Sequence, residues 1–172
     1  RFKDVDQEED YQKKIVSCLH DETKYSHVKD SDVYIEISKL LNKAAVLQTN
    51  LDRSLEKCLS IPTHTNINLP DPVSVPCLIY LHGIVTDPQS WIIARDEYNN
   101  YYQRNPGFVN FIQKVFQRFD VLFIGYSLGD KEILDQIAKV NGSGRQYIFV
   151  MEEDERIRAD NDVVENDLKH YG

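Results

Sequence analysis

Short, uninterrupted apolar runs alternate with segments of helical spacing along the chain. Four runs are apolar almost throughout and lead into polar or glycine-containing loops, a pattern typical of strands buried on both faces of a parallel sheet. Between them, apolar residues recur every three or four positions, most clearly from Phe108 to Phe119, and this spacing predicts amphipathic helices. The runs predict strands at residues 44–48, 77–81, 121–124 and 146–151.

The segments between the strands predict helices with recognisable ends. Asp30-Ser-Asp32 is typical of an N-cap before a helix that runs to Leu41, and Asp130 indicates the start of a helix through Ile137. Residues 60–76 hold four of the six prolines, so we expect a long loop there. Further helices are predicted at residues 7–19, 54–59, 95–103, 108–119 and 163–171.

This alternation favours a single α/β domain over residues 1–172, with a Rossmann-like parallel sheet and helices on both of its faces. A chain of 172 residues can bury one core of ordinary size, and two full domains are not expected. Parallel sheets of this class bind ligands at the carboxyl ends of their strands. We expect three polar clusters to meet there at one edge: residues 49–52, 82–83 and 125–127.

The charge balance limits the partners to be expected. The chain carries 28 acidic and 20 basic residues, a net charge of -8, which discourages binding to nucleic acid or to an anionic membrane. No apolar run approaches the roughly 20 residues that cross a bilayer, and the charged N-terminal residues do not resemble a secretory leader. Cys18, Cys58 and Cys77 form no C-x-x-C pair, which predicts reduced thiols, a cytoplasmic location and no structural zinc.

Four segments resemble a known family. Residues 46–52 (VLQTNLD) resemble the signature that ends a strand in sirtuin-like proteins, and residues 78–83 (LIYLHG) look like their histidine-glycine segment. Asp87-Pro-Gln-Ser90 with Asp96-Glu-Tyr98, and residues 123–130 (FIGYSLGD), are similar to segments of a bacterial branch of that family. Because the pieces occur in order, the middle half of the chain resembles this branch.

The resemblance implies an NAD site in which three residues carry the chemistry. Cleavage between nicotinamide and ribose passes through a sugar cation, so the site must hold the carboxamide, place water and supply a base. By the family pattern, Asn50 would position the ribose and the water, and Asp52 would accept a hydrogen bond from the nicotinamide amide. His82 would act as the base, because an imidazole can exchange a proton near neutral pH.

Four further positions are implied as contacts with the dinucleotide: Thr49, Gly83, Gly125 and Ser127. Gly125 and Ser127 would lie at the adenosine side, where glycine permits close approach of the backbone. Thr49 stands where ordinary sirtuins have glutamine, so this chain differs from them at one ribose contact.

The implied function is that of an NAD hydrolase that releases nicotinamide and ADP-ribose, with NAD as substrate and no metal. Such bacterial domains commonly serve antiphage defence by depleting NAD, and the resemblance further implies a homo-oligomer with a fused or associated sensor domain. The paired-cysteine zinc module of the deacylases is absent, which argues against peptide deacylation. No G-x-G precedes Ala44. We therefore expect either that the chain is a fragment that lacks the N-terminal segment of the domain with its phosphate loop, or that the protein does not bind the dinucleotide.

Other interpretations stay open. Asn50 and Asp52 can simply cap the helix that follows them. The chain can also be a non-catalytic sensor module of the same fold that binds NAD or another nucleotide. Gly125-Tyr-Ser-Leu-Gly129 matches the G-x-S-x-G elbow that would make Ser127 the nucleophile of a serine hydrolase. Only 43 residues follow Gly129, however, which leaves little room for the later strands, acid and histidine of that fold.

Overall fold

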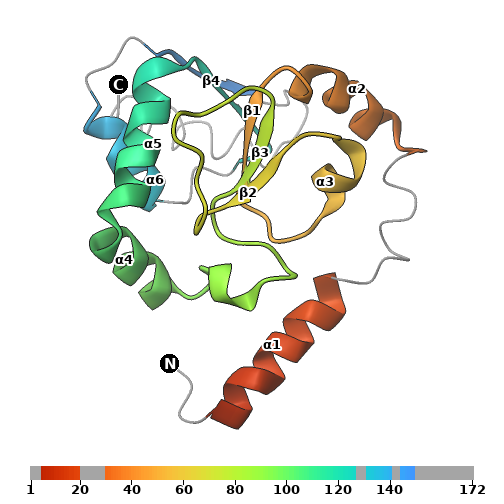
Figure 1. Cartoon of the computed structure of the whole chain (residues 1–172), viewed down its shortest axis with the longest axis vertical. Coiled ribbons are helices and arrows are strands. Elements are labelled where there is room, and N and C mark those ends of the chain that lie inside the picture. Colours follow the sequence, from red (N-terminus) through yellow and green to blue (C-terminus); the bar gives the residue numbers. More distant parts are fainter. Residues whose placement is uncertain (1–4, 20–29, 127–130, 141–143, 150–172) are drawn as a thin grey trace, which may run out of the picture. The chain divides into compact units, whose positions relative to one another are not determined.

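The computed structural model of the chain describes residues 5–19, 30–126, 131–140 and 144–149. It divides into two compact units, residues 1–94 and residues 95–172. Figure 1 shows the helices and strands of each, coloured along the sequence. Within the described ranges, no helix combines the length and the apolar character that crossing a bilayer requires. The expected helix at residues 163–171 and the expected cap at Asp130 lie outside these ranges.

The first unit is built around a short parallel sheet. Its strand order is β1-β3-β2, with Val46 of β1 and Thr63 of β2 both opposite Leu78 of β3. The strands β1 and β3 occur where the apolar runs predicted them, and their parallel pairing is confirmed. The elements of this unit are α1 (Val5–Leu19), α2 (Asp32–Leu41), β1 (Ala45–Gln48), α3 (Ser54–Cys58), β2 (Thr63–Thr65), β3 (Cys77–Tyr80) and the 3-10 helix η2 (Pro88–Ser90).

The strand β2 corrects the expectation of an unbroken loop at residues 60–76. Thr63-His-Thr65 is too short and polar to stand out as an apolar run, but it pairs with the side of β3 that β1 leaves open. Two of its three residues are β-branched, which suits an extended backbone. This strand is therefore created by tertiary pairing rather than by a local hydrophobic signal.

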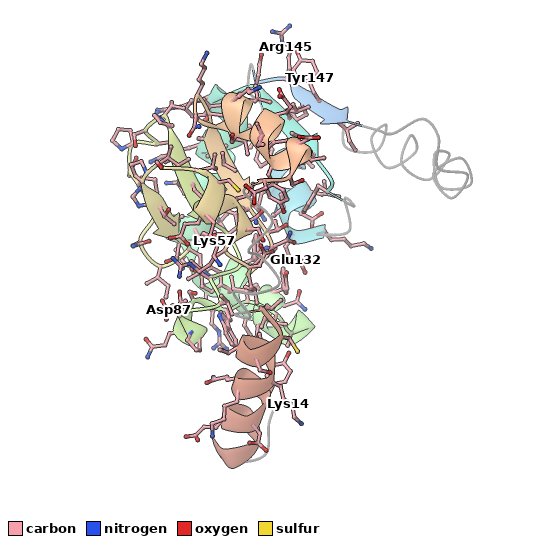
Figure 2. All side chains as sticks on the ribbon, turned by 90° about the vertical axis from the view of Figure 1, so that its right-hand side faces the viewer. Lys14, Lys57, Asp87, Glu132, Arg145 and Tyr147 are labelled. Atoms are coloured by element: carbon pink, nitrogen blue, oxygen red, sulfur yellow. The ribbon has the colours of Figure 1, made fainter. Side chains whose placement is uncertain are left out.

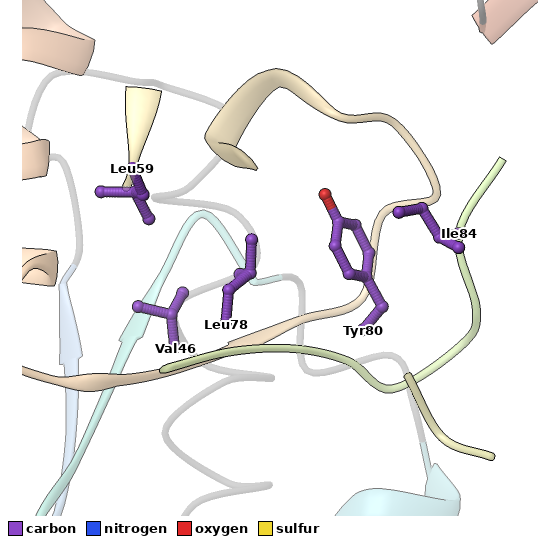
Figure 3. Close-up of a cluster of buried hydrophobic side chains, with 5 residues drawn as sticks. All are labelled: Val46, Leu59, Leu78, Tyr80 and Ile84. Carbon is purple, nitrogen blue, oxygen red and sulfur yellow. The ribbon is translucent and has the colours of Figure 1, made fainter. Parts of the chain in front are cut away.

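The central strand explains where the core of this unit lies. All four residues of β3 are fully buried, because neighbours flank both of its edges and side chains cover both of its faces. Figure 3 shows Val46, Leu78 and Tyr80 on one side of the sheet, in a cluster that also contains Leu59 and Ile84. Burial of both faces is the physical reason why the sequence of β3 is an uninterrupted apolar run.

The second unit packs helices against a two-stranded parallel sheet. The predicted stripe of α5 is buried at Phe108, Phe111, Ile112, Val115 and Phe116. The helix begins one residue after Asn105, whose side chain accepts a hydrogen bond from the Phe108 amide at 3.0 Å, as an N-cap should. The elements are α4 (Arg95–Arg104), α5 (Pro106–Arg118), β4 (Val121–Ile124), α6 (Lys131–Ala138) and β5 (Gln146–Phe149).

Hydrogen bonding divides the predicted strands between two sheets. β4 pairs with β5 in parallel, with Val121 opposite Gln146, whereas β1, β2 and β3 form the other sheet. The parallel α/β class is confirmed, with helices packed beside parallel strands. The expectation that the four apolar runs share one hydrogen-bonded sheet is not met among the described residues.

Candidate functional site

The loops that follow β1 and β3 lie next to each other at the carboxyl end of the first sheet. Gln48 and Tyr80 are opposite each other in the strand register, so Asn50 and His82 each lie two residues beyond a paired position. The Leu81 amide donates to the Gln48 carbonyl at 2.8 Å, and the Val85 amide donates to the Leu51 carbonyl at 2.9 Å. These two bonds join the loop carrying Asn50 and Asp52 to the loop carrying His82.

The three catalytic candidates differ in their exposure. Asn50 is exposed, Asp52 is half-buried, and His82 is buried with 4% of its surface exposed. Thr49, on the same loop as Asn50, is half-buried. An exposed amide can meet a ligand from solvent, whereas a buried imidazole is held in one place by the groups around it. The Asn50 amide is thus accessible from solvent, whereas the His82 imidazole is held in position by the residues that bury it.

Asp52 also has the structural role that the capping interpretation assigned to it. One carboxylate oxygen accepts a hydrogen bond from the amide of Ser54, the first residue of α3, at 2.9 Å. Arg53 and Glu56 form a paired contact beside it, with nitrogen–oxygen distances of 2.6 and 3.1 Å. A carboxylate has a second oxygen with its own acceptor sites, so capping α3 and contacting a ligand are compatible roles.

Tyr80 is a buried tyrosine whose pKa is affected by the charged residues that follow β1. Its side chain is fully buried, and its hydroxyl has no hydrogen-bond partner among the described residues. Burial raises the pKa of Tyr80 most, and the negative charges of Glu56 and Asp52 raise it further, while Arg53 lowers it. The phenol therefore stays neutral. Because Glu56 is paired with Arg53, Asp52 is the carboxylate of these two that has no such ion pair within the described part of the chain.

Gly83 occupies a position that only glycine can fill. Its φ angle is +93°, in a region that other residues rarely adopt. A Cβ atom at Gly83 would overlap the carbonyl group of Ser90. The turn directly after His82 therefore requires both the positive φ and the missing side chain.

The Asp87-Pro-Gln-Ser90 segment folds back onto this turn. Asp87, labelled in Figure 2, accepts a hydrogen bond from the Gln89 amide at 3.2 Å and so starts η2. The Ser90 hydroxyl accepts from the Ile84 amide at 3.1 Å and donates to the Asp87 carbonyl at 2.7 Å. Trp91 donates its indole N–H to the Ile84 carbonyl at 2.7 Å.

Asn66 is a buried polar residue that sequence reasoning missed. It follows β2 directly, is 3% exposed, and donates its side-chain amide to the Ser90 carbonyl at 2.9 Å. No sequence signal could have identified it, because the strand that positions it was itself not expected. Its place at the end of β2 puts it on the same sheet edge as the loops after β1 and β3.

The third predicted cluster belongs to the second unit. Gly125 directly follows β4 and has a φ angle of +60°, and a Cβ atom there would meet nothing within 4 Å. Tyr126 stacks on Phe123 with ring centroids 5.5 Å apart. Ser127 lies outside the described residues. The meeting of Gly125 and Ser127 with His82 at one edge stays a prediction.

Within the described ranges, no three His, Cys, Asp or Glu side chains form a group that could hold a metal ion. Cys18 is exposed, Cys58 is half-buried and Cys77 is buried, and none of them is in a disulfide.

Comparison with known proteins adds one finding. A sequence model of the SIR2-like domain matches residues 44–172, from the residue before β1 to the end of the chain. None of the curated proteins compared with the chain matches it. The matched range includes the loops of Asn50 and His82 and the end of β4.

Proposed function

The chain belongs to the SIR2-like family, whose members are NAD-dependent enzymes, and we propose that it hydrolyses NAD to nicotinamide and ADP-ribose. The observation that carries this proposal is the bonding of the Asn50 and His82 loops at the carboxyl end of one parallel sheet. Ligands of such sheets bind at that end. The amide, the carboxylate and the imidazole that the chemistry needs are present on these two loops.

The proposed reaction assigns one task to each of these side chains. The bond between the ribose carbon and the nicotinamide nitrogen breaks, and its electron pair leaves with the neutral nicotinamide. Asn50 holds a water molecule and the ribose, and His82 takes the proton of that water as its oxygen bonds to the sugar carbon. Asp52 accepts a hydrogen bond from the nicotinamide carboxamide, and the negative charge of its carboxylate favours the sugar cation.

The biological setting is a further part of the proposal. Because four segments of the chain resemble a bacterial branch whose domains deplete NAD in antiphage defence, we propose that the chain is an effector of such defence in the cytoplasm. We propose that it acts as a homo-oligomer under the control of a fused or associated sensor domain. The net charge of -8 supports a partner other than nucleic acid or an anionic membrane.

The direct test is release of nicotinamide from NAD by the full-length protein. His82→Ala should lower the rate by about 100- to 10,000-fold, the usual effect of losing a positioned base. Asn50→Ala should have a comparable effect, with a change in unfolding free energy of only about 1 kcal/mol or less because the side chain is exposed. His64→Ala is the matched control, since His64 lies on the neighbouring strand β2 and is half-buried.

Two results would contradict the proposal. Full NAD turnover by His82→Ala would remove the assigned base. Binding of NAD by calorimetry without any nicotinamide release would instead favour the non-catalytic sensor module, because a binding module has no need of a base.

A further inference from the structure

We propose that Ser90 and Asn66 are positioning residues that set the place of His82 relative to the loop of Asn50. Neither residue has a task in the proposed reaction, and both are buried, at 1% and 3% exposure. The predicted effect of these two residues on NAD turnover rests on the proposed function. Their predicted effect on the conformation of the turn after His82 does not.

The Ser90 hydroxyl is placed at the centre of the turn. It accepts a hydrogen bond from the Ile84 amide at 3.1 Å and donates one to the Asp87 carbonyl at 2.7 Å. It thus uses its donor and its acceptor within the protein, and its bond with the Ile84 amide is buried. Removal of the hydroxyl would leave the buried Ile84 amide without its acceptor, which costs more than a surface hydrogen bond.

Asn66 connects Ser90 to the end of the sheet. Its backbone amide donates to the Tyr80 carbonyl at 3.0 Å, and its side-chain amide donates to the Ser90 carbonyl at 2.9 Å. Tyr80 is the last residue of β3 and lies two residues before His82. The segments before and after the histidine are therefore both tied to Asn66.

Backbone contacts around the turn explain why a displacement of Ser90 would also displace His82. The His82 carbonyl accepts from the Ile92 amide at 3.0 Å, and Gly83 lies so close to Ser90 that a Cβ atom would not fit. The Val85 amide continues the chain of bonds to the Leu51 carbonyl, beside Asn50. Ser90 therefore determines both the turn that presents the imidazole and its link to the Asn50 loop.

The test compares Ser90→Ala with Ile112→Val in the full-length protein. Ile112 is fully buried in α5 of the second unit, so its variant loses stability through packing and removes none of the hydrogen bonds of the turn. Two measurements follow the turn itself: the ¹H–¹³C signal of the His82 imidazole, assigned by its loss in His82→Gln, and the hydrogen-exchange rate of the Ile84 amide. A third measurement is kcat and KM for nicotinamide release from NAD.

We expect Ser90→Ala to shift or split the His82 signal and to speed exchange of the Ile84 amide roughly tenfold. We expect kcat to fall by about 100-fold, as a misplacement of about 1 Å can cause, with a smaller change in KM. Ile112→Val should leave all three readouts near their wild-type values. Ser90→Cys keeps the shape but has a weak donor and acceptor, so it should give intermediate values and serves if Ser90→Ala does not fold.

Several outcomes would overturn the inference. An unchanged His82 signal and unchanged Ile84 exchange in Ser90→Ala would do so, even if the variant were less stable. So would changes of equal size in Ile112→Val. If the wild-type protein releases no nicotinamide, the proposed function fails, and the two spectroscopic readouts alone decide whether Ser90 positions His82.

Discussion

The backbone amide of Val85 donates a hydrogen bond to the carbonyl of Leu51 at 2.9 Å. Val85 lies three residues after His82, and Leu51 lies between Asn50 and Asp52, so this one bond joins the two loops that carry the catalytic candidates. Both loops are anchored at the carboxyl end of paired strands. Backbone hydrogen bonds therefore hold the two loops of the candidate site together. A small change in the backbone of either loop should shift the side chains of Asn50, Asp52 and His82.

Gly83→Ala should be the most damaging small substitution in the first unit. The residue has a φ angle of +93°, and the new methyl group would overlap the Ser90 carbonyl. We expect a loss of about 3 kcal/mol or more in unfolding free energy, from backbone strain and overpacking together. Urea denaturation measures this loss.

Gly125→Ala is the matched control for that prediction. Gly125 also has a positive φ angle, +60°, but a Cβ atom there would meet nothing within 4 Å. Its substitution should cost only the conformational penalty of about 1–2 kcal/mol. Equal losses of unfolding free energy in Gly83→Ala and Gly125→Ala would show that the close contact between Gly83 and Ser90 adds nothing to the cost of the substitution.

Substitutions of Asp52 should separate its charge from its capping bond. Asp52→Asn retains an oxygen for the Ser54 amide and removes the charge, whereas Asp52→Ala removes both. We expect both variants to lose NAD turnover, but only Asp52→Ala to lose about 1 kcal/mol of stability as well. Nicotinamide release and thermal unfolding, measured on the same samples, distinguish the two effects. Wild-type turnover in Asp52→Asn would leave Asp52 with a capping role alone.

Ser127→Ala should separate NAD hydrolysis from the serine-hydrolase alternative. If Ser127 only contacts the adenosine side of NAD, its loss should weaken NAD affinity modestly and leave most of the turnover. A serine nucleophile, in contrast, is needed for nearly all turnover. Assays with NAD and with an ester substrate should be run in parallel. An esterase activity that disappears in Ser127→Ala would replace the proposed function by the alternative.

The pair of Asp120 and Arg145 predicts a small dependence of stability on acid pH. The Arg145 backbone amide, and then its guanidinium, hold the pKa of Asp120 below its usual value, each through a contact of 3.0 Å. A carboxyl whose pKa is lowered by folding stabilises the protein above its unfolded pKa, and this contribution is lost as the pH falls through the folded pKa.

Asp120→Asn should therefore lower the urea midpoint slightly at neutral pH and have a decreasing effect below about pH 4. The effect is small because both side chains are exposed, and added salt should weaken it further. Arg145 also lies over the ring of Tyr147, 5.7 Å from its centroid, and both are labelled in Figure 2. A difference between the two proteins that grows in acid would contradict the assigned direction.

Several elements could be predicted because their signals are local. The apolar runs of β1, β3 and β4 and the stripe of α5 appear close to their predicted positions. For β3 and α5 the reason is burial, which requires apolar residues at every position of a covered strand and along one face of a helix. In β4 the run is apolar although Leu122 and Ile124 are exposed. The SIR2-like family was also correctly inferred from short segments around Asn50, His82 and Gly125. The joining of both units into one domain stays a prediction.

Other features were decided only by contacts between distant parts of the chain. β2 is a strand because Thr63–Thr65 can pair with β3, and the division into two sheets depends on which strand edges meet. Asn66 and Ser90 are 24 residues apart in sequence and are joined by one hydrogen bond. The sequence alone determined which residue types stand at the strand ends, because composition and spacing are written along the chain. The tertiary structure decided which buried polar groups hold those residues in place, because such partners are chosen by proximity in space.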